Sequence, residues 1–245
     1  MDAEKVKGTF RADGVVEHYS RSVVNIGLWR SEERIFRRVF REEDSLLDLG
    51  CGAGRICIGL WELGYRNLLG VDYSAEMIRE ARRLCGLMEY GIALRTGDAV
   101  GLELDDGAFD GVIFGFNGLM QIPGRERRRR ALTEINRVLR PGGAFVFTTH
   151  DREHRSLREL FAMQQQIWAR GEQPADLNEF GDNFFRAPEG DVFMHLPDRS
   201  EVLEDLAATG FEHEFDAMRS EIANEPGDVR EFSDECRFWL ATKPA

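Results

Sequence analysis

The chain has 245 residues, of which 42% are hydrophobic and 31% charged, and its formal net charge is -12. This length and composition predict a globular protein with one large domain, or one domain that carries an insertion. The acidic balance argues against general nucleic-acid binding, because phosphate contacts require clustered positive charge.

The sequence offers no signal for a membrane, for secretion or for a zinc site. No apolar run approaches the length needed to cross a bilayer, and the opening residues MDAEKVKGTFRADG lack the apolar core of a secretory signal. The four cysteines form no C-x-x-C pair and have no histidines at zinc spacing, so free buried thiols are expected. We therefore expect a cytoplasmic protein without membrane contact.

Predicted helices and strands alternate over roughly 46–149. The first helix covers 31–41, with Ser31 as its N-cap residue and acidic residues in its first turn. Ser74 caps a later helix that points Met77 inward. The other predicted elements are a helix at 56–63 and strands at 45–49, 67–71, 92–96, 111–116 and 144–149, the last of these after the turn RPGG. This alternation predicts an α/β fold with a doubly wound, mostly parallel sheet.

An arginine-rich run, RERRRR at Arg125–Arg130, opens another predicted helix. It is open to interpretation as an RNA contact. However, the chain has 29 arginines and only 3 lysines, a bias that points to genome composition. The helix also has an apolar inner face, formed by Ala131, Leu132, Ile135, Val138 and Leu139. We therefore expect a solvated helix start.

After His150 the alternation stops. Residues 151–190 predict a helix over Ser156–Ala169 and then a loop rich in Gly, Pro, Asp and Phe, which together resemble an insertion. Regularity returns with a helix at 199–209 that ends at Gly210. Two late strands, at 211–218 and 236–243, are joined by about 17 residues and predict an antiparallel pair at the sheet edge.

The stretch LLDLGCGAGR, Leu46 to Arg55, is the most informative part of the chain. A buried strand leads into three close glycines, which allow a sharp turn and let a ligand lie against bare backbone. Asp72 ends the next predicted strand, where a carboxylate can accept hydrogen bonds from ribose hydroxyls. The order G-x-G-x-G does not fit the dinucleotide pattern G-x-G-x-x-G, and no Walker loop occurs. A nucleoside site and a mere tight turn both remain open at this point.

Five ordered motifs decide between them: LLDLGCGAGR, GVDYSAEMIREAR, TGDA, FDGVIFGFNGL and EINRVLRPGGAFVFTTH. With these motifs the chain resembles the class I S-adenosylmethionine-dependent methyltransferases, in their small-molecule branch. The resemblance covers about 45–149 and resumes over 199–243. It implies S-adenosylmethionine as the cofactor and a Rossmann-like, seven-stranded sheet with an antiparallel last strand, plus an inserted lid after the fifth strand.

The resemblance also implies contacts to the cofactor. Gly50, Cys51 and Gly52 would lie under its methionine part, and Asp72 would hold the ribose hydroxyls. The adenine would meet Tyr73, the Asp98 carboxylate and the Ala99 amide, while Asn117 would border the sulfonium and the acceptor. Further expected cofactor-site residues are Tyr19, Trp29 and Met77, and Phe116 is a further candidate for cation–π contact with the sulfonium. The alternatives without a binding role are a turn residue at Asp98, a surface aromatic at Tyr73 and a strand terminator at Asn117.

Histidines 18, 150, 154, 195 and 213 are candidates for a general base, should the acceptor carry a proton. His150 and His195 are the best placed, although a structural role is the alternative for each. In the insertion, Phe180, Phe184, Phe185 and Arg186 are expected to form a lid or the lid's own small core. Asn117, Phe185 and Arg186 are the expected acceptor contacts. No metal site is expected, because no acidic cluster of the catechol type is evident.

These features predict methyl transfer to an oxygen or nitrogen of a small metabolite. The alternatives are methylation of a protein side chain or a tRNA base, and a cofactor-binding protein without activity. The loop FGFNGL lacks the N-P-P-Y type of amino-methylating DNA enzymes, and no Pro-Cys nucleophile is present. The expected division of the chain is 1–44, a helical segment over the cofactor site; 45–150, the core; 151–198, the lid and acceptor region; and 199–245, the end of the core.

Overall fold

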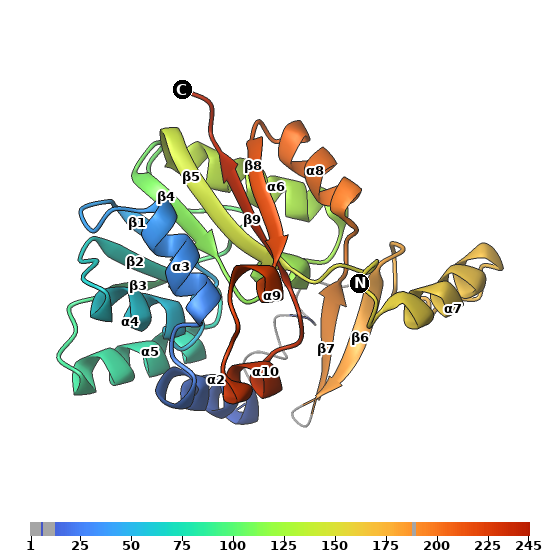
Figure 1. Ribbon diagram of the computed structural model, residues 1–245, viewed down its shortest axis with the longest axis horizontal. Coiled ribbons are helices and arrows are strands. Elements are labelled where there is room, and N and C mark those ends of the chain that lie inside the picture. The colour runs from blue at the N-terminus through green and yellow to red at the C-terminus, as the bar shows by residue number, and fades with distance from the viewer. Residues whose placement is uncertain (1–5, 7–12, 188–189) are drawn as a thin grey trace.

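A computed structural model describes residues 6, 13–187 and 190–245. Seven strands form one sheet in the order β3-β2-β1-β4-β5-β9-β8 (Figure 1). These strands are β1 Leu46–Leu49, β2 Leu68–Asp72, β3 Ala93–Thr96, β4 Phe109–Phe114, β5 Leu139–Thr149, β8 Glu212–Met218 and β9 Arg237–Thr242. The helices that pack on the sheet are α3 Arg30–Val39, α4 Arg55–Glu62, α5 Ala75–Leu87, α6 Arg125–Val138 and α8 Arg199–Ala208.

Both faces of the sheet are apolar, which is what buried parallel strands require. Leu47, Val112 and Phe145 point toward α6 and α8 in one core cluster. The alternate residues Leu46 and Ile113 belong to a second cluster, with α3 and α4. The doubly wound arrangement predicted from the alternating pattern is therefore confirmed, and in the described residues no helix is long and apolar enough to cross a membrane.

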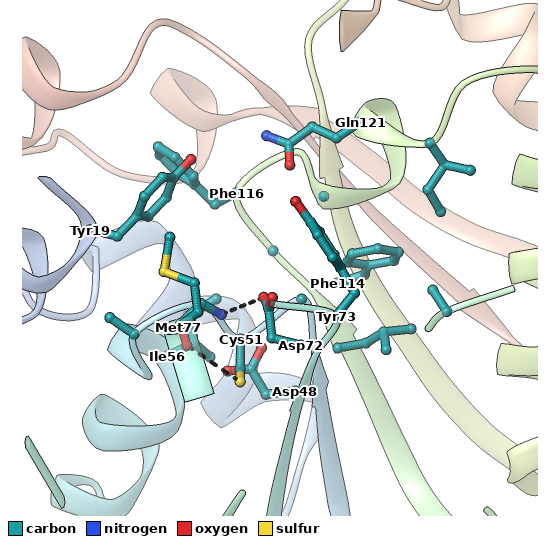
Figure 2. A pocket seen from close by; sticks show the side chains of 18 of the residues that line it. Tyr19, Asp48, Cys51, Ile56, Asp72, Tyr73, Met77, Phe114, Phe116 and Gln121 are labelled. Carbon is teal, nitrogen blue, oxygen red and sulfur yellow. Dashed lines mark hydrogen bonds between the residues drawn. The ribbon is translucent and has the colours of Figure 1, made fainter. Parts of the chain in front are cut away.

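The chain reverses its direction of strand addition between β1 and β4, which pair in parallel with each other. In open α/β sheets the crevice at such a switch point, beyond the carboxyl ends of the strands, is where ligands bind. The residues that line a pocket at this edge are shown in Figure 2.

The antiparallel strand is also confirmed. β9 pairs antiparallel with β5 on one side and with β8 on the other, so β8 forms the edge and the last strand lies one place inside it. Trp239 of β9 donates from Nε1 to Thr149 Oγ1 at 2.9 Å. The connection between β8 and β9 contains α9 Arg219–Ile222 and α10 Gly227–Phe232. It begins and ends at the carboxyl end of β5, because Met218 and Thr149 both pair with Arg237.

The expected cap of the first sheet-packing helix is wrong. α3 begins at Arg30 with Trp29 as the N-cap residue, and Ser31 is buried in the first turn with its hydroxyl unpaired. The free amides of Arg30 and Ser31 instead donate to the two carboxylate oxygens of Glu225, at 3.0 and 2.8 Å. A remote carboxylate thus performs the task that a local serine side chain performs in an ordinary cap.

The expected RPGG turn before the fifth strand is wrong as well. β5 extends through these residues, and its register with β4 shifts between Leu139 and Ala144. Gly142 absorbs the irregularity with φ +77°, and its amide donates to the carbonyl of Lys243. Pairing with neighbouring strands keeps this segment in the sheet as a bulge.

The insertion contains more structure than the sequence suggested. The expected helix is present as α7 Arg158–Ala169, and the expected loop contains a hairpin of β6 Asp182–Ala187 and β7 Gly190–His195. Figure 1 shows α7 projecting away from the sheet. Phe180 meets the rings of Phe161 and Trp168 edge-on, so this aromatic cluster is a small core within the insertion.

The arginine run at the start of α6 is not simply solvated, contrary to expectation. Arg125 and Arg129 form ion pairs with Asp205 of α8, each at 2.8 Å. Arg128 is only 4% exposed and contacts Glu179 of the insertion at 2.6 Å and Glu201 at 3.4 Å. Carboxylates that lie 50 to 80 positions later in the sequence therefore neutralise this part of the run.

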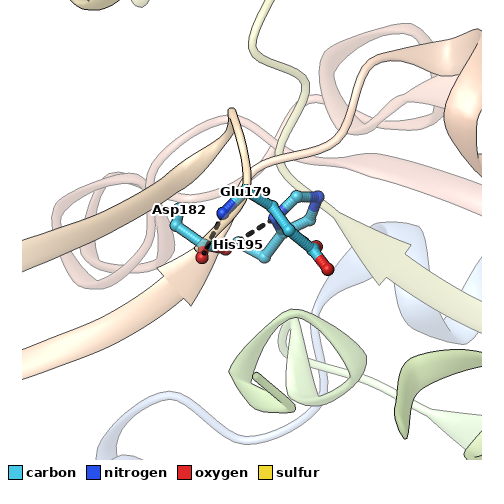
Figure 3. Close-up of side chains that lie close together, drawn as sticks. All are labelled: Glu179, Asp182 and His195. Carbon is cyan, nitrogen blue, oxygen red and sulfur yellow. Dashed lines mark hydrogen bonds and ion pairs between the residues drawn. The ribbon is translucent and has the colours of Figure 1, made fainter. Parts of the chain in front are cut away.

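His195 lies at the centre of the same charged network (Figure 3). Its Nδ1 contacts Asp182 at 2.8 Å and its Nε2 contacts Glu201 at 2.7 Å. Burial disfavours the charged ring, but hydrogen bonds to Asp182 and Glu201 outweigh it, so the pKa of His195 is raised. The protonated ring joins the insertion to α8.

Glu179, Asp182 and His195 also bring three metal-ligand atoms within 4.8 Å of one another. Two positive groups already pair with these carboxylates, since Arg128 contacts Glu179 and the His195 imidazole contacts Asp182. Backbone amides of residues 178 and 179 donate to the second Asp182 oxygen. We therefore interpret the cluster as an ion-pair network that fastens the insertion.

We predict that His195→Gln lowers the free energy of unfolding by about 3 kcal/mol near pH 6, because it leaves the buried carboxylate of Asp182 without its cation. A raised pKa means that the histidine stabilises the fold fully below its unfolded value and loses this effect as pH rises through the folded value. Wild-type stability should therefore approach that of the variant toward pH 9. Urea denaturation followed by circular dichroism measures both, with His154→Gln as control. A constant difference across this pH range would contradict the assignment.

Candidate functional site

A pocket lies at the carboxyl ends of β1, β2 and β4, and α2 (Asp13–Asn25) closes one side of it (Figure 2). Its empty space is about 1140 Å³, counting its open mouth. Most of the residues expected at a cofactor site line it: Tyr19, Gly50, Cys51, Gly52, Asp72, Tyr73, Met77, Asp98 and Ala99.

The glycine turn forms the floor of this pocket. Gly50, Gly52 and Gly54 all have positive φ, at 68°, 52° and 94°, which side chains rarely tolerate. A Cβ on Gly50 would lie 2.8 Å from Cε2 of Phe114. The turn thus requires glycine for its backbone conformation and leaves bare peptide groups at the pocket surface.

Asp72 fixes the turn from the neighbouring strand. One carboxylate oxygen accepts from the amide of Gly52 at 2.9 Å and the other accepts from the amide of Ser74 at 2.8 Å. Burial raises the pKa of Asp72 to about 6, although both amides favour the ionised form. Each oxygen retains a further lone pair for a ligand.

Asp48, the acid within the glycine motif, is a second buried carboxyl in the lining. The thiol of Cys57 donates to its Oδ2 at 3.1 Å. Burial raises the pKa of Asp48 to about 7, against the lowering effect of that hydrogen bond. The charge of the pocket floor therefore changes within the neutral pH range. The cysteines described here are free and buried, as expected.

Aromatic rings form the wall above the glycine turn. Phe116 stacks on Phe232 of α10 with ring centroids 5.1 Å apart and meets Tyr19 edge-on at 5.9 Å. Phe116 and Asn117 adopt successive left-handed conformations, with φ 47° and 62°. Two such residues in sequence store backbone strain, which surrounding contacts must hold.

Trp29 does not line the pocket, in contrast to the sequence-based expectation. It is 1% exposed and lies between two guanidinium groups, with Arg55 at 4.9 Å and Arg219 at 5.0 Å from its ring. Arg55 does line the pocket and forms two hydrogen bonds of 2.6 Å with Glu32. The tryptophan therefore supports a residue of the wall.

Asn117 and His150 lie together just behind the lining. Nδ2 of Asn117 is 3.2 Å from Nε2 of His150, and Nδ1 of that ring is 2.9 Å from the carbonyl of Glu235. A carbonyl accepts only, so Nδ1 carries the proton and Nε2 accepts from the asparagine. Burial lowers the pKa of His150. The ring connects the end of β4 to the segment that precedes β9.

The remaining predicted catalytic and acceptor residues whose side chains are described do not line the pocket. His195 does not line it, and both ring nitrogens are engaged in the network described above. Phe185 packs beside the small cluster of Met120, Phe161 and Leu196. His154 and His213 contact Ser156 and Asp216. The side chains of His18 and Arg186 lie outside the described part of the structure.

Several lining residues were missed by sequence reasoning. Gln121 comes from the segment between β4 and α6, Arg127 from the first turn of α6, and Phe232 from α10. Arg127 could have been found from the sequence, because it belongs to the arginine run at Arg125–Arg130, which was interpreted as solvated. The connection between β8 and β9 gave none, since its helices are short and their partners are distant in sequence.

A family model described as a methyltransferase domain matches residues 46–143. Among curated relatives, a demethylmenaquinone methyltransferase of Symbiobacterium thermophilum is 33% identical over 144 residues, which cover 55% of each chain. Its counterpart in Lactiplantibacillus plantarum is 32% identical over 150 residues, 58% of this chain and 60% of that one. The chain thus spans little more than half the length of these relatives.

Solved structures agree on the fold. A methyltransferase from Methanosarcina mazei superposes with a TM-score of 0.70 at 21% identity, over 89% of this chain and 99% of that one. A protein from Pyrococcus horikoshii gives 0.66 at 23% identity, over 96% and 95%. Over residues 46–143 the chain is thus similar to a methyltransferase domain, and its fold is the one found in these solved structures.

Proposed function

We propose that the protein transfers the methyl group of S-adenosylmethionine to an oxygen or nitrogen of a small, flat acceptor. The observation that supports this most strongly is the joint presence of a bare glycine turn and a buried carboxyl, Asp72, in one pocket. Two curated relatives are named demethylmenaquinone methyltransferases, which is consistent with a non-macromolecular acceptor.

The pocket residues fit the cofactor chemically. A Cβ at Gly50 would clash with Phe114, so the turn keeps the open surface that a ligand lying on the backbone needs. Asp72 would accept the ribose hydroxyls with its remaining lone pairs, and Asp98 with the Ala99 amide would meet the adenine. When bound, the cofactor supplies an electrophilic methyl group on a sulfonium.

The chain itself must orient the acceptor and exclude water, because in-line transfer to a good electrophile requires little else. The stack of Phe116 on Phe232 and the edge of Tyr19 suit a planar apolar molecule. The same rings can stabilise a nearby cation through their faces. A ring carbon is the alternative acceptor atom, since methylation of demethylmenaquinone occurs on carbon.

The first prediction concerns the ribose contact. Asp72→Asn should weaken binding of S-adenosylhomocysteine about tenfold or more, because the charged hydrogen-bond acceptor is lost. In the wild type, affinity should fall as pH decreases from 7 to 5, since the carboxyl protonates around its pKa of about 6. Isothermal titration calorimetry at several pH values measures both effects.

The exposed carboxylate Asp105 gives a matched control, and Asp105→Asn should bind like the wild type. The pKa of Asp48 is about 7, so its titration overlaps that of Asp72. Asp48→Asn removes this second titration and leaves the pH dependence that Asp72 causes. Unchanged affinity in Asp72→Asn would show that the ribose assignment is wrong.

A second prediction separates a base from a positioning residue at His150. Because its Nε2 accepts from Asn117 and burial lowers its pKa, we expect it to hold Asn117 in place. His150→Gln keeps an acceptor oxygen and should retain methyl transfer to within about threefold, whereas His150→Leu should lose more. A general base typically contributes about 100-fold or more, so an equal, large loss in both variants would instead identify a base.

A third prediction tests the reaction itself. Incubation with methyl-labelled cofactor and a low-mass cell extract should place the label in the small-molecule fraction. Gly50→Ala should abolish transfer, because the added Cβ would collide with Phe114. Label confined to protein or tRNA would favour a macromolecular acceptor. Tight cofactor binding without any transfer would favour a protein that only senses or carries the cofactor.

A further inference from the structure

The arginine run of α6 divides into two groups with different surroundings. Arg125, Arg128 and Arg129 are turned toward α8 and the insertion, where each forms an ion pair. Arg127 lines the pocket instead. Within the described residues, its side chain forms no hydrogen bond or ion pair, and its Nε is buried without a partner.

An unpaired buried guanidinium nitrogen is costly. Arginine cannot release its proton at neutral pH, and each N–H group that leaves water needs an acceptor. The chain has 44 acidic residues against 32 basic ones. Carboxylates pair with the three neighbouring arginines, but none pairs with Arg127 among the described residues. A buried polar group left unsatisfied in this way indicates a partner that binds from outside.

The position of Arg127 indicates which ligand its unpaired guanidinium would bind. Its neighbours in the lining are Gln121, Ile122 and Pro123, from the segment after β4. Figure 2 shows the amide of Gln121 directed into the pocket across from Asp72. Most of the residues expected to hold the cofactor, Asp72 among them, come from the ends of β1, β2 and β3.

The charges of the two ligands also favour the methyl acceptor, and not the cofactor, as the partner of Arg127. The sulfonium and ammonium groups of the cofactor repel a guanidinium, and its carboxylate belongs to the methionine part, which is expected to lie over the glycine turn. An anionic oxygen on the acceptor would be attracted by both Arg127 and the sulfonium, and the planar guanidinium fork matches a carboxylate in two hydrogen bonds.

We propose that Arg127 binds an anionic oxygen of the methyl acceptor, which is therefore an aromatic acid or an ionised hydroxyl compound. This inference rests on the proposed function, because it assigns the second ligand of the same pocket. Gln121 supplies a neutral hydrogen-bonding group on the same wall. The aromatic stack of Phe116 and Phe232 holds the ring of such a molecule.

The experiment compares two probes of one shape, 2-naphthoate and 2-naphthamide, in calorimetric titrations of protein saturated with S-adenosylhomocysteine. The wild type should prefer the carboxylate by about 10- to 100-fold, the range expected for hydrogen bonds to a charged group. Arg127→Met should reduce this preference to near unity, and Arg127→Lys should keep part of it. Arg130 is exposed on the same helix, so Arg130→Met should leave the preference unchanged.

Three results would overturn the inference: no preference in the wild type, an equal preference in Arg127→Met, or a loss of S-adenosylhomocysteine affinity in Arg127→Met as large as the loss for the carboxylate. The last result would assign the arginine to the cofactor. Binding of S-adenosylhomocysteine alone and transfer of labelled methyl report on the proposed function separately. A protein that binds the cofactor product and transfers methyl without discriminating the probes would retain its function and lose only this inference.

Discussion

The buried ion pair between Arg55 and Glu32 is the contact on which the architecture of the site depends. It ties the helical segment before the sheet to the first turn after the glycines, with both side chains under 10% exposed. Removal of one partner from such a pair leaves an uncompensated charge and costs about 3–5 kcal/mol. The same guanidinium lies over the Trp29 ring, and the guanidinium of Arg219 lies 5.0 Å from that ring, so contacts through Trp29 link the pair to the β8–β9 connection.

The pocket is consequently an assembly of three regions that are far apart in sequence. The ends of the parallel strands supply the glycine turn and the carboxyls, α2 supplies Tyr19, and α10 supplies Phe232. His150 and Glu225 fasten these regions to one another through hydrogen bonds to backbone groups. The rigid sheet provides precision at the proposed cofactor half. The proposed acceptor half is formed by loops and short helices, which is where specificity can vary without change to the fold.

Sequence reasoning succeeded where the cause of a structure is local. The positive φ of Gly50 requires glycine whatever surrounds it, and the alternating apolar runs that predict the parallel sheet are readable within a few residues. It failed where the partner is remote. Ser31 looks like a cap until Glu225 is brought to its helix, and Arg128 looks solvated until Glu179 folds over it. His150 followed a strand end as a base would, but its surroundings, the amide of Asn117 and a carbonyl before β9, cannot be read from spacing.

The place of β9 between β5 and β8 has a consequence for synthesis on the ribosome. A nascent chain that has not yet emerged beyond about residue 242 can form β1 to β5 but has no strand on which β8 can pair. In such a chain, the Glu225 cap of α3 and the ring of Phe232 are also not yet held in position. The edge of β5 must then remain open as an unpaired strand, a state prone to aggregation. Completion of the sheet and completion of the acceptor wall are therefore one late folding event.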